Sequence, residues 1–305
     1  MASVTVVGAG VVGLTTALCL REAGHLVRVI AAERPERTTS AAAGAVWYPF
    51  KVGPREKVNR WARTTREWLR ELAEKIPEAG VDVVTVLECV SSARRPWWAD
   101  AVEGLRLVEG PQPSGATLAW EFEAPRVEPV LHLRWLESQL ERPIEIARVE
   151  RLEDVPGAVV VNCTGIGARR LTGDATLQAL LGQTVLVAPG EVDMRRMYGE
   201  ERDLAAMLYV IPRRTEVVIG GCAIPFDGDV PPPPDPALRR AFLERARAAG
   251  FRHGPVLRDS VGLRPVRPEV RLEREGRVIH HYGHGGAGYT LARGSAEELV
   301  SGIEA

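Results

Sequence analysis

Several features that mark specialised protein classes are scarce or absent in this 305-residue sequence. The four cysteines are dispersed and form no Cys-x-x-Cys pair, which argues against a disulfide framework and for a reducing, cytoplasmic compartment. No unbroken apolar run reaches about 18 residues, so no transmembrane helix is expected. The apolar stretch 4–20 lacks the basic residues that open a signal peptide, and its glycine spacing has another explanation.

An excess of charge of either sign is also absent. Lysine plus arginine number 39 and aspartate plus glutamate number 40, which gives a net charge of -1. This balance argues against binding to nucleic acid or to a membrane surface through bulk electrostatics. With 45% hydrophobic and 26% charged residues, the composition is typical of a globular protein that is long enough for two domains.

A glycine-rich loop follows the first strand that the sequence predicts. The β-branched run 4–7 indicates a buried parallel strand, residues 14–23 have helical spacing, and residues 26–30 indicate a second strand. The loop 8–13 between the first strand and the helix has the spacing Gly-x-Gly-x-x-Gly. This β–α–β order, with Glu33 after the second strand, is typical of a dinucleotide-binding site.

Each glycine of this loop has a physical task in such a site. Gly8 permits the tight turn, Gly10 lets the backbone approach a pyrophosphate, and Gly13 lets the helix pack closely on the strand. The anion would lie at the positive end of the helix, where the macrodipole and free backbone amides stabilise it. Glu33 would accept hydrogen bonds from an adenosine ribose.

Two further glycine turns begin at the ends of predicted strands. The apolar run 158–163 leads into the turn 164–167, and a short β-branched pair leads toward the loop 283–288, which precedes a helical pattern. Ligands bind at the carboxyl edge of the strands in open α/β sheets, so we expect these turns to contact the same cofactor as the first loop. The small-residue segment 38–45 is either backbone pressed against that ligand or a flexible loop.

The order of elements predicts an α/β fold in two parts. Further helices are expected at 56–76, 128–140 and 236–249, further strands at 83–90, 183–188, 209–211 and 216–219, and a strand-and-turn pattern at 149–155. Parallel-type strands thus occur at the start, middle and end of the chain. We therefore predict a discontinuous Rossmann-like cofactor-binding domain, formed by 1–50, 128–182 and 266–305, and an α+β substrate domain with a mainly antiparallel sheet, formed by 51–127 and 183–265.

Three sequence patterns together resemble one known family. They are Val6-Val7-Gly8-Ala9-Gly10-Val11-Val12-Gly13-Leu14, Gly262-Leu263-Arg264-Pro265-Val266-Arg267-Pro268, and His280-His281-Tyr282-Gly283-His284-Gly285-Gly286-Ala287-Gly288 followed by Gly294-Ser295-Ala296. This combination resembles the signature of the D-amino-acid oxidase family. The resemblance covers essentially the whole chain, because Ala43-Gly44 with Trp47, Asn162-Cys163-Thr164-Gly165 and Arg271-Leu272-Glu273-Arg274-Glu275 are also similar to that family's blocks.

The resemblance implies a flavoenzyme that binds FAD non-covalently, so the cofactor-binding domain is expected to be an FAD-binding domain. Enzymes of this family oxidise a D-amino acid to an imino acid, which hydrolyses to a 2-oxo acid and ammonia. The α-hydrogen leaves as hydride to flavin N5, and dioxygen then reoxidises the flavin and yields hydrogen peroxide. The implied partners are a D-amino acid and O2, and a homodimer is the family-level expectation.

Three residues are implied on the substrate side. An amino-acid carboxylate needs a planar, permanently charged, two-pronged partner, which only arginine supplies, and Arg264 matches the family's carboxylate-binding arginine. Tyr209 matches a tyrosine whose hydroxyl also reaches the carboxylate. Gly286 matches a residue whose carbonyl accepts a hydrogen bond from the substrate amine. Hydride transfer requires no general base, and the sequence offers no convincing candidate for one.

The cofactor side follows from the same resemblance. The backbone amides of 283–288 would donate to the flavin carbonyl, where negative charge develops as the ring accepts hydride. No metal is expected, because the three histidines 280, 281 and 284 have no carboxylate companion in their glycine loop. The residues implied to bind FAD are Gly8, Gly10, Val11, Val12, Gly13, Glu33, Arg34, Thr39, Ala43, Gly44, Trp47, Val149, Thr164, Gly283, Gly285, Gly286, Gly288, Tyr289 and Thr290.

The sequence departs from the family's pattern on the substrate side. A second active-site tyrosine of many relatives falls on Ala205, so the lid segment 195–208 is altered, and Tyr198 is the candidate to compensate. D-Aspartate oxidases often carry an arginine after the strand that ends in Gly220-Gly221-Cys222, where this chain has Ala223. We therefore expect neutral D-amino acids as substrates.

Alternative functions stay open at this point. Arg195, Arg196 and Arg202 in the lid leave room for a D-aspartate oxidase, and a glycine/sarcosine-type amine oxidase would share the fold. A non-catalytic FAD- or nucleotide-binding protein is the alternative from a different class.

Overall fold

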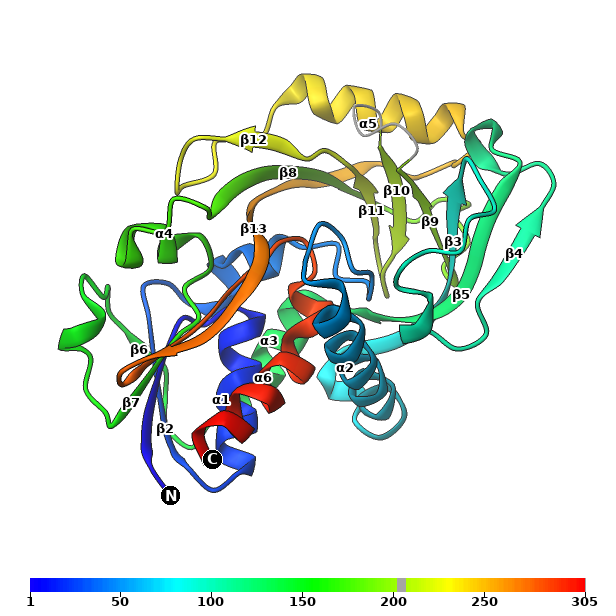
Figure 1. Ribbon diagram of the computed structural model, residues 1–305. Coiled ribbons are helices and arrows are strands. Elements are labelled where there is room, and N and C mark those ends of the chain that lie inside the picture. Colours follow the sequence, from blue (N-terminus) through cyan, green and yellow to red (C-terminus); the bar gives the residue numbers. More distant parts are fainter. Residues whose placement is uncertain (202–206, 305) are drawn as a thin grey trace.

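The computed structural model describes residues 1–201 and 207–304, and its strands form one mixed sheet with helices packed against it (Figure 1). The parallel part contains β1 (Ser3–Val7), β2 (Leu26–Ala31), β6 (Glu145–Ile146), β7 (Val159–Asn162) and β14 (Val278–His284). β1 pairs in parallel with β2 and β7, and β7 pairs in parallel with β14. Every residue of β7 is buried, which explains its unbroken apolar run.

Four helices form the core beside the parallel strands. α1 (Val11–Glu22), α3 (Pro129–Ser138) and α6 (Gly288–Glu304) pack together there, and α2 (Arg55–Lys75) packs against α6 (Figure 1). Aliphatic side chains from all four fill the space between them, among them Leu14, Leu69, Leu133 and Leu299. Their burial fixes the N-terminal ends of α1 and α6, each of which follows a glycine loop.

The antiparallel part forms the other half of the sheet. It consists of β3 (Val81–Val90), β4 (Arg106–Glu109), β5 (Leu118–Val127), β8 (Gln178–Val187), β9 (Arg196–Glu200), β10 (Leu208–Pro212), β11 (Val217–Gly220) and β12 (Ile224–Phe226). Its paired strands run antiparallel, apart from β3 and β9, which are parallel. α5 (Pro236–Ala248) covers β8, β10 and β11 on one face (Figure 1). Phe242 and Leu243 of this helix are buried in the core. The short helix α4 (Ala168–Thr172) lies between β7 and β8 in the chain.

One long strand, β13 (Val256–Glu275), belongs to both parts. Its first half pairs with β8, its second half pairs with β14, and the register shifts between Val266 and Arg271 (Figure 1). The strand order is therefore β4-β5-β3-β9-β10-β11-β8-β13-β14-β7-β1-β2-β6, with β12 beside β8. The predicted domain boundary at 265/266 falls at this irregularity, and the five domain segments themselves stay predictions.

The arrangement confirms the predicted α/β fold class, and it corrects one element. Residues 149–155 were expected to continue a strand-and-turn pattern, but they contain a short 3-10 helix, Leu152–Asp154. The apolar residues of this stretch recur every third position, and Leu152 and Val155 are buried against β7. Within the described ranges, no helix is long and apolar enough to cross a membrane.

Candidate active site

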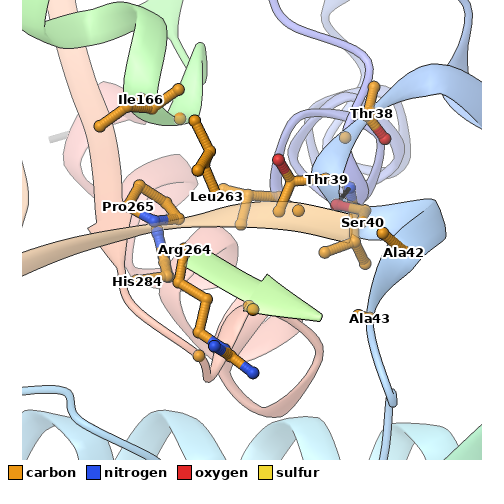
Figure 2. A pocket seen from close by; sticks show the side chains of 18 of the residues that line it. Thr38, Thr39, Ser40, Ala42, Ala43, Ile166, Leu263, Arg264, Pro265 and His284 are labelled. Carbon is orange, nitrogen blue, oxygen red and sulfur yellow. Dashed lines mark hydrogen bonds between the residues drawn. The ribbon is translucent and has the colours of Figure 1, made fainter. Parts of the chain in front are cut away.

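A cavity of about 800 Å³ is lined by residues from both parts of the sheet. All three predicted glycine turns contribute to its wall, with 8–12, 164–167 and 283–286. Figure 2 shows the segment that carries Thr38 to Ala43 running beside β13, with Arg264 leaving that strand on one side and Leu263 on the other. Loops that are far apart in the sequence thus face one space.

The first loop has no room for side chains at two of its glycines. Gly8 has a φ of 118°, which favours glycine, and a Cβ there would collide with the carbonyl oxygen of Cys163. A Cβ on Gly13 would collide with the carbonyl oxygen of Gly8. Gly13 is buried and does not line the cavity, so its place fits the close helix packing predicted for it and not direct contact with a ligand.

The N-terminus of α1 faces the same cavity, where Gly10, Val11 and Val12 line the wall. Gly10 is the N-cap and makes no side-chain capping bond, while the Val11 N–H donates to Ser40 Oγ at 2.9 Å. The first amides of an α-helix have no acceptors within the helix. Together with the positive end of the helix dipole, they make this end of the cavity suited to an anionic group.

The acidic residue at the end of β2 lies where the motif predicts it. Glu33 lines the cavity, and its carboxylate is 3.9 Å from Arg37, which also lines it. Arg34, which the resemblance placed at the adenosine end, does not line the cavity. Its guanidinium points to Glu137 at 3.9 Å and its side chain is 67% exposed, so Arg37 is the arginine at this end.

The small-residue segment 38–45, which follows β2, forms part of the cavity wall. Thr39, Ala43 and Gly44 line the cavity, and a Cβ on Gly44 would lie 2.7 Å from the Ile211 side chain. The buried Arg213 donates to the Ala43 carbonyl at 2.6 Å and pairs with a glutamate at the start of β11. These contacts pin the backbone of the segment against β10.

The structure places two implied cofactor residues behind the wall. Trp47 is fully buried, its indole N–H donates to the Ala62 carbonyl at 2.8 Å, and it does not line the cavity. The Thr290 hydroxyl bonds the backbone N–H and carbonyl of Tyr48, each at 3.0 Å, and it does not line the cavity either. Both side chains hold the loop that carries Tyr48, which does line it.

The turn after β7 contributes Thr164, whose hydroxyl donates to Asn162 Oδ1 at 2.7 Å. Val149 also lines the cavity, as does Tyr289 at the start of α6. The Tyr289 hydroxyl donates to the Ser40 carbonyl at 3.1 Å, which ties α6 to the small-residue segment.

The C-terminal glycine loop is packed tightly against residues 50–51. A Cβ on Gly285 would collide with the Lys51 carbonyl oxygen, and one on Gly286 would lie 2.7 Å from the Phe50 ring. The Gly285 N–H donates to the Pro265 carbonyl at 2.8 Å, and its φ is 56°. The loop therefore presents backbone to the cavity, with Gly283, Gly285, Gly286 and Gly288 all on the wall.

Two buried histidines of this region, His281 and His284, line the cavity. His281 bonds Thr16 Oγ1 at 3.0 Å and Ser295 Oγ at 2.9 Å, and burial lowers its pKa well below its ordinary value. Burial also lowers the pKa of His284 to about 3, so both rings are neutral at pH 7. Within residues 1–201 and 207–304, no group of three or more His, Cys, Asp or Glu side chains is placed to hold a metal ion.

The arginine singled out by the sequence lies at the antiparallel end of the cavity. Arg264 Nη1 donates to the Cys222 carbonyl at 2.8 Å, and its guanidinium lies over Gly182, where a Cβ would collide with it. The guanidinium carbon is also 5.8 Å from the centre of the Phe50 ring. These contacts fix one side of the guanidinium and leave the other directed to the cavity that it lines.

Tyr209 lies close to this arginine. It lines the cavity, and its ring covers Gly220 and Gly221, where a Cβ would collide with it. Burial raises the pKa of Tyr209, an effect that the positive charge of Arg264 partly offsets. Its hydroxyl is therefore protonated at pH 7 and can donate a hydrogen bond to an anion.

Tyr198 is not brought to the site. It does not line the cavity, and its hydroxyl donates to the Pro113 carbonyl at 2.9 Å, so it does not compensate for the tyrosine missing at position 205. The neighbouring Arg196 pairs with Glu121 at 3.7 Å, and neither it nor Arg195 lines the cavity. The predictions for Arg202 and Ala205 lie outside the described residues.

Three acidic residues of this end were missed by sequence reasoning. Glu88, Glu200 and Glu201 all line the cavity. Burial raises the pKa of Glu88 well above its ordinary value, and the charges of Glu201 and Glu200 add to the effect. Burial raises the pKa of Glu201 to about 7, although Arg264 and Lys51 act in the opposite direction. One signal in the sequence could have identified them, which is that Glu88 lies inside the apolar run of β3.

Comparison with known proteins decides the family. The family model described as "FAD dependent oxidoreductase" matches residues 3–301. The chain belongs to this family. The predicted FAD cofactor and the predicted class of oxidoreductase are therefore confirmed.

Curated relatives of this FAD-dependent oxidoreductase cover nearly its whole length. A D-amino-acid oxidase of Rubrobacter xylanophilus is 42% identical over 99% of this chain and 95% of its own. A D-amino-acid oxidase of Streptomyces coelicolor is 37% identical over 97% and 95%, and a human D-aspartate oxidase is 32% identical over 98% and 94%. Among solved structures, a glycine oxidase from Bacillus cereus superposes with a TM-score of 0.81 at 18% identity, covering 100% of this chain and 95% of its own, which shows the shared fold.

The residues present fit FAD. The Gly8 turn brings backbone to the cavity without a Cβ, and the amide end of α1 beside it suits a pyrophosphate. Glu33 lies two residues beyond the end of the neighbouring strand β2, where the motif requires a ribose partner. The wall of bare backbone at 285–286 leaves space for a flat ring system.

Proposed function

We propose that this FAD-dependent oxidoreductase is a D-amino-acid oxidase that converts neutral D-amino acids to 2-oxo acids, ammonia and hydrogen peroxide, with O2 as electron acceptor. The observation that carries the proposal is the position of Arg264 and Tyr209 in the same cavity as the glycine loops. Relatives at 42% and 37% identity that are named D-amino-acid oxidases support it.

Arg264, Tyr209 and Gly286 would position the substrate. The free edge of the Arg264 guanidinium would bind the carboxylate, and the protonated Tyr209 hydroxyl would donate a second hydrogen bond to it. The Gly286 carbonyl would accept a hydrogen bond from the amine. The chemistry that FAD supplies when bound is acceptance of the α-hydrogen as hydride and reduction of O2 to hydrogen peroxide. Orientation of the α-carbon is thus the main task of the protein.

The residues proposed to hold FAD are those on the wall. Amides at the N-terminal end of α1, around Gly10 and Val12 and beside the Val11 N–H that donates to Ser40 Oγ, would bind the pyrophosphate, and Glu33 would bind the ribose. Amides of the loop 283–288, other than those of Gly285 and Ala287, which donate to the Pro265 and His284 carbonyls, would donate to the flavin carbonyl, where negative charge develops. Thr39, Ala43, Gly44, Val149, Thr164 and Tyr289 would complete the cofactor wall.

A substrate with a second carboxylate is disfavoured by the charges at this end of the cavity. Glu88 and Glu201 line it, and the lid arginines 195 and 196 do not. A D-aspartate oxidase is therefore the weaker reading, although the human relative carries that name.

A cytoplasmic location and a homodimer belong to the same proposal. Four cysteines that are all buried thiols support the former, and light scattering of the purified protein tests the latter.

An anaerobic spectral titration of the FAD-bound protein tests the proposal. D-Alanine, D-valine and D-phenylalanine should bleach the oxidised flavin, while L-alanine should leave it oxidised. Bleaching by D-aspartate or glycine alone would assign the alternative specificities. Bleaching by L-alanine and not by its enantiomer, or by no amine at all, would overturn the proposal.

A further inference from the structure

A row of residues crosses the sheet at the antiparallel end of the cavity. Glu88 on β3 pairs with Gly199 on β9, Gly199 pairs with Tyr209 on β10, and Tyr209 pairs with Gly220 on β11. Residues directly opposite each other on neighbouring strands share a face of the sheet. Glu88 and Tyr209 therefore project to the same side, two strand spacings apart, which is about 10 Å between their backbones.

The glycine between them lets Glu88 lie across the sheet. A Cβ on Gly199 would collide with Glu88 Oε2, so the carboxyl group covers the glycine on the side of β9 that leads to Tyr209. Any larger residue at 199 would force the carboxyl group away. The arrangement repeats the one at Arg264, whose guanidinium lies over Gly182.

Within the part of the chain that the structure describes, Glu88 has no counter-ion that would make it a structural residue. It is only 5% exposed, and it lines the cavity. Among residues 1–201 and 207–304, no basic nitrogen lies within 4.0 Å of its carboxyl oxygens, and no hydrogen bond to them is formed. A buried carboxyl group without a counter-ion is costly, and burial accordingly raises its pKa. A cation that entered the cavity would supply the missing partner.

We propose that Glu88 recognises the side chain of the substrate, and that the cavity accepts D-amino acids with cationic side chains, such as D-lysine and D-arginine, in preference to neutral side chains of the same shape. The inference rests on the proposed function and extends its substrate range. With the carboxylate at Arg264 and Tyr209, a long side chain that runs along the row would bring its cationic end to Glu88. Glu201, which also lines this end, adds negative potential.

Matched substrate pairs test the inference on the FAD-bound enzyme. D-Arginine is compared with D-citrulline, and D-lysine with D-norleucine, because each pair differs chiefly in the charge at the far end. We expect kcat/KM to be at least about tenfold higher for the charged member of each pair, as a hydrogen-bonded ion pair in a buried site provides. In Glu88→Gln this ratio should fall to about one or below, whereas Glu123→Gln, a change at an exposed glutamate on β5, should keep it.

Each outcome of this experiment is decisive. Equal kcat/KM for both members of the pairs in the unaltered enzyme, or an unchanged ratio in Glu88→Gln, would overturn the inference. Should Glu88→Gln fail to fold with FAD, the ratios of the unaltered enzyme and of Glu88→Asp, which retains the charge, decide alone. Oxidation of neutral D-amino acids without a preference for cations removes the inference and leaves the proposed function. Failure of every D-amino acid to bleach the flavin removes both.

Discussion

The Arg264 guanidinium lies directly over Gly182 on the neighbouring strand, where any side chain would displace it. Gly182 pairs with Gly262, two residues before Arg264, so neither β8 nor β13 has a side chain at this pair of positions. The Cys222 carbonyl then holds Nη1 at 2.8 Å. The position of the proposed carboxylate partner thus depends on a residue that need not touch the substrate.

Gly182→Ala should therefore impair substrate binding. The added methyl group would push the guanidinium from its position and weaken a charge-assisted contact that contributes ~2–5 kcal/mol. We expect KM for a D-amino acid to rise by at least about tenfold, while the protein still folds. Steady-state kinetics in excess FAD measure this, with Gly302→Ala, which meets no atom within 4 Å, as the control. An unchanged KM would show that the guanidinium is not required in this position.

Tyr209→Phe and Tyr198→Phe should separate the two tyrosines. Loss of the Tyr209 hydroxyl removes one hydrogen bond to the substrate carboxylate, of about 1.5–3 kcal/mol, so KM should rise by about tenfold or more. Tyr198 does not line the cavity and bonds Pro113, so its variant should keep the KM of the unaltered enzyme and lose only stability. Kinetic constants and thermal melts of both variants provide the measurement. A raised KM in Tyr198→Phe alone would contradict the assignment.

Gly8→Ala should weaken FAD binding. The φ of 118° is nearly restricted to glycine, which costs a substituted residue ~1–3 kcal/mol, and the Cβ would also collide with the Cys163 carbonyl. The loop must shift, and the amides beside it move from the proposed pyrophosphate position. Fluorescence titration of the apoprotein with FAD should show a Kd at least about tenfold higher. Gly167→Ala is the matched control, because Gly167 lines the same cavity and its Cβ would make only ordinary contacts, the nearest at 3.6 Å.

The glycine loops could be predicted from the sequence because their requirements are local. A strand, a bare turn and a helix start follow one another within a few residues, and Gly8 and Gly285 have the backbone that such turns need. In an irregular segment, the direction in which a side chain points depends on contacts with residues that are distant in the sequence. Trp47 and Tyr48 are adjacent, yet only Tyr48 faces the cavity, because Trp47 is held in the core by the Ala62 carbonyl.

Glu88 shows why part of the substrate end could not be predicted. Its significance depends on Gly199, 111 positions later in the chain, being its neighbour on β9. Position in a sheet is set by pairing between distant strands, and no spacing in the sequence encodes that pairing. Arg34 and Arg37 are a second example. Arg34 points to Glu137 on α3 and does not line the cavity, whereas Arg37 does.

Asp174→Asn should destabilise the protein at neutral pH. Burial raises the pKa of Asp174, but hydrogen bonds from Thr176, Tyr282 and Arg267 outweigh it and lower the pKa to about 2. The folded pKa lies below the unfolded value of about 3.9, so the carboxylate stabilises the fold above pH 4 and loses this contribution as the pH falls toward 2. Thermal melts should show a deficit of ~2 kcal/mol in Asp174→Asn at pH 7 that shrinks between pH 4 and pH 3. Asp227→Asn, at a fully exposed side chain, should show no such dependence. Because Tyr282 and Arg267 belong to β14 and β13, a deficit that stays constant with pH would mean that the carboxylate charge does not hold these strands together.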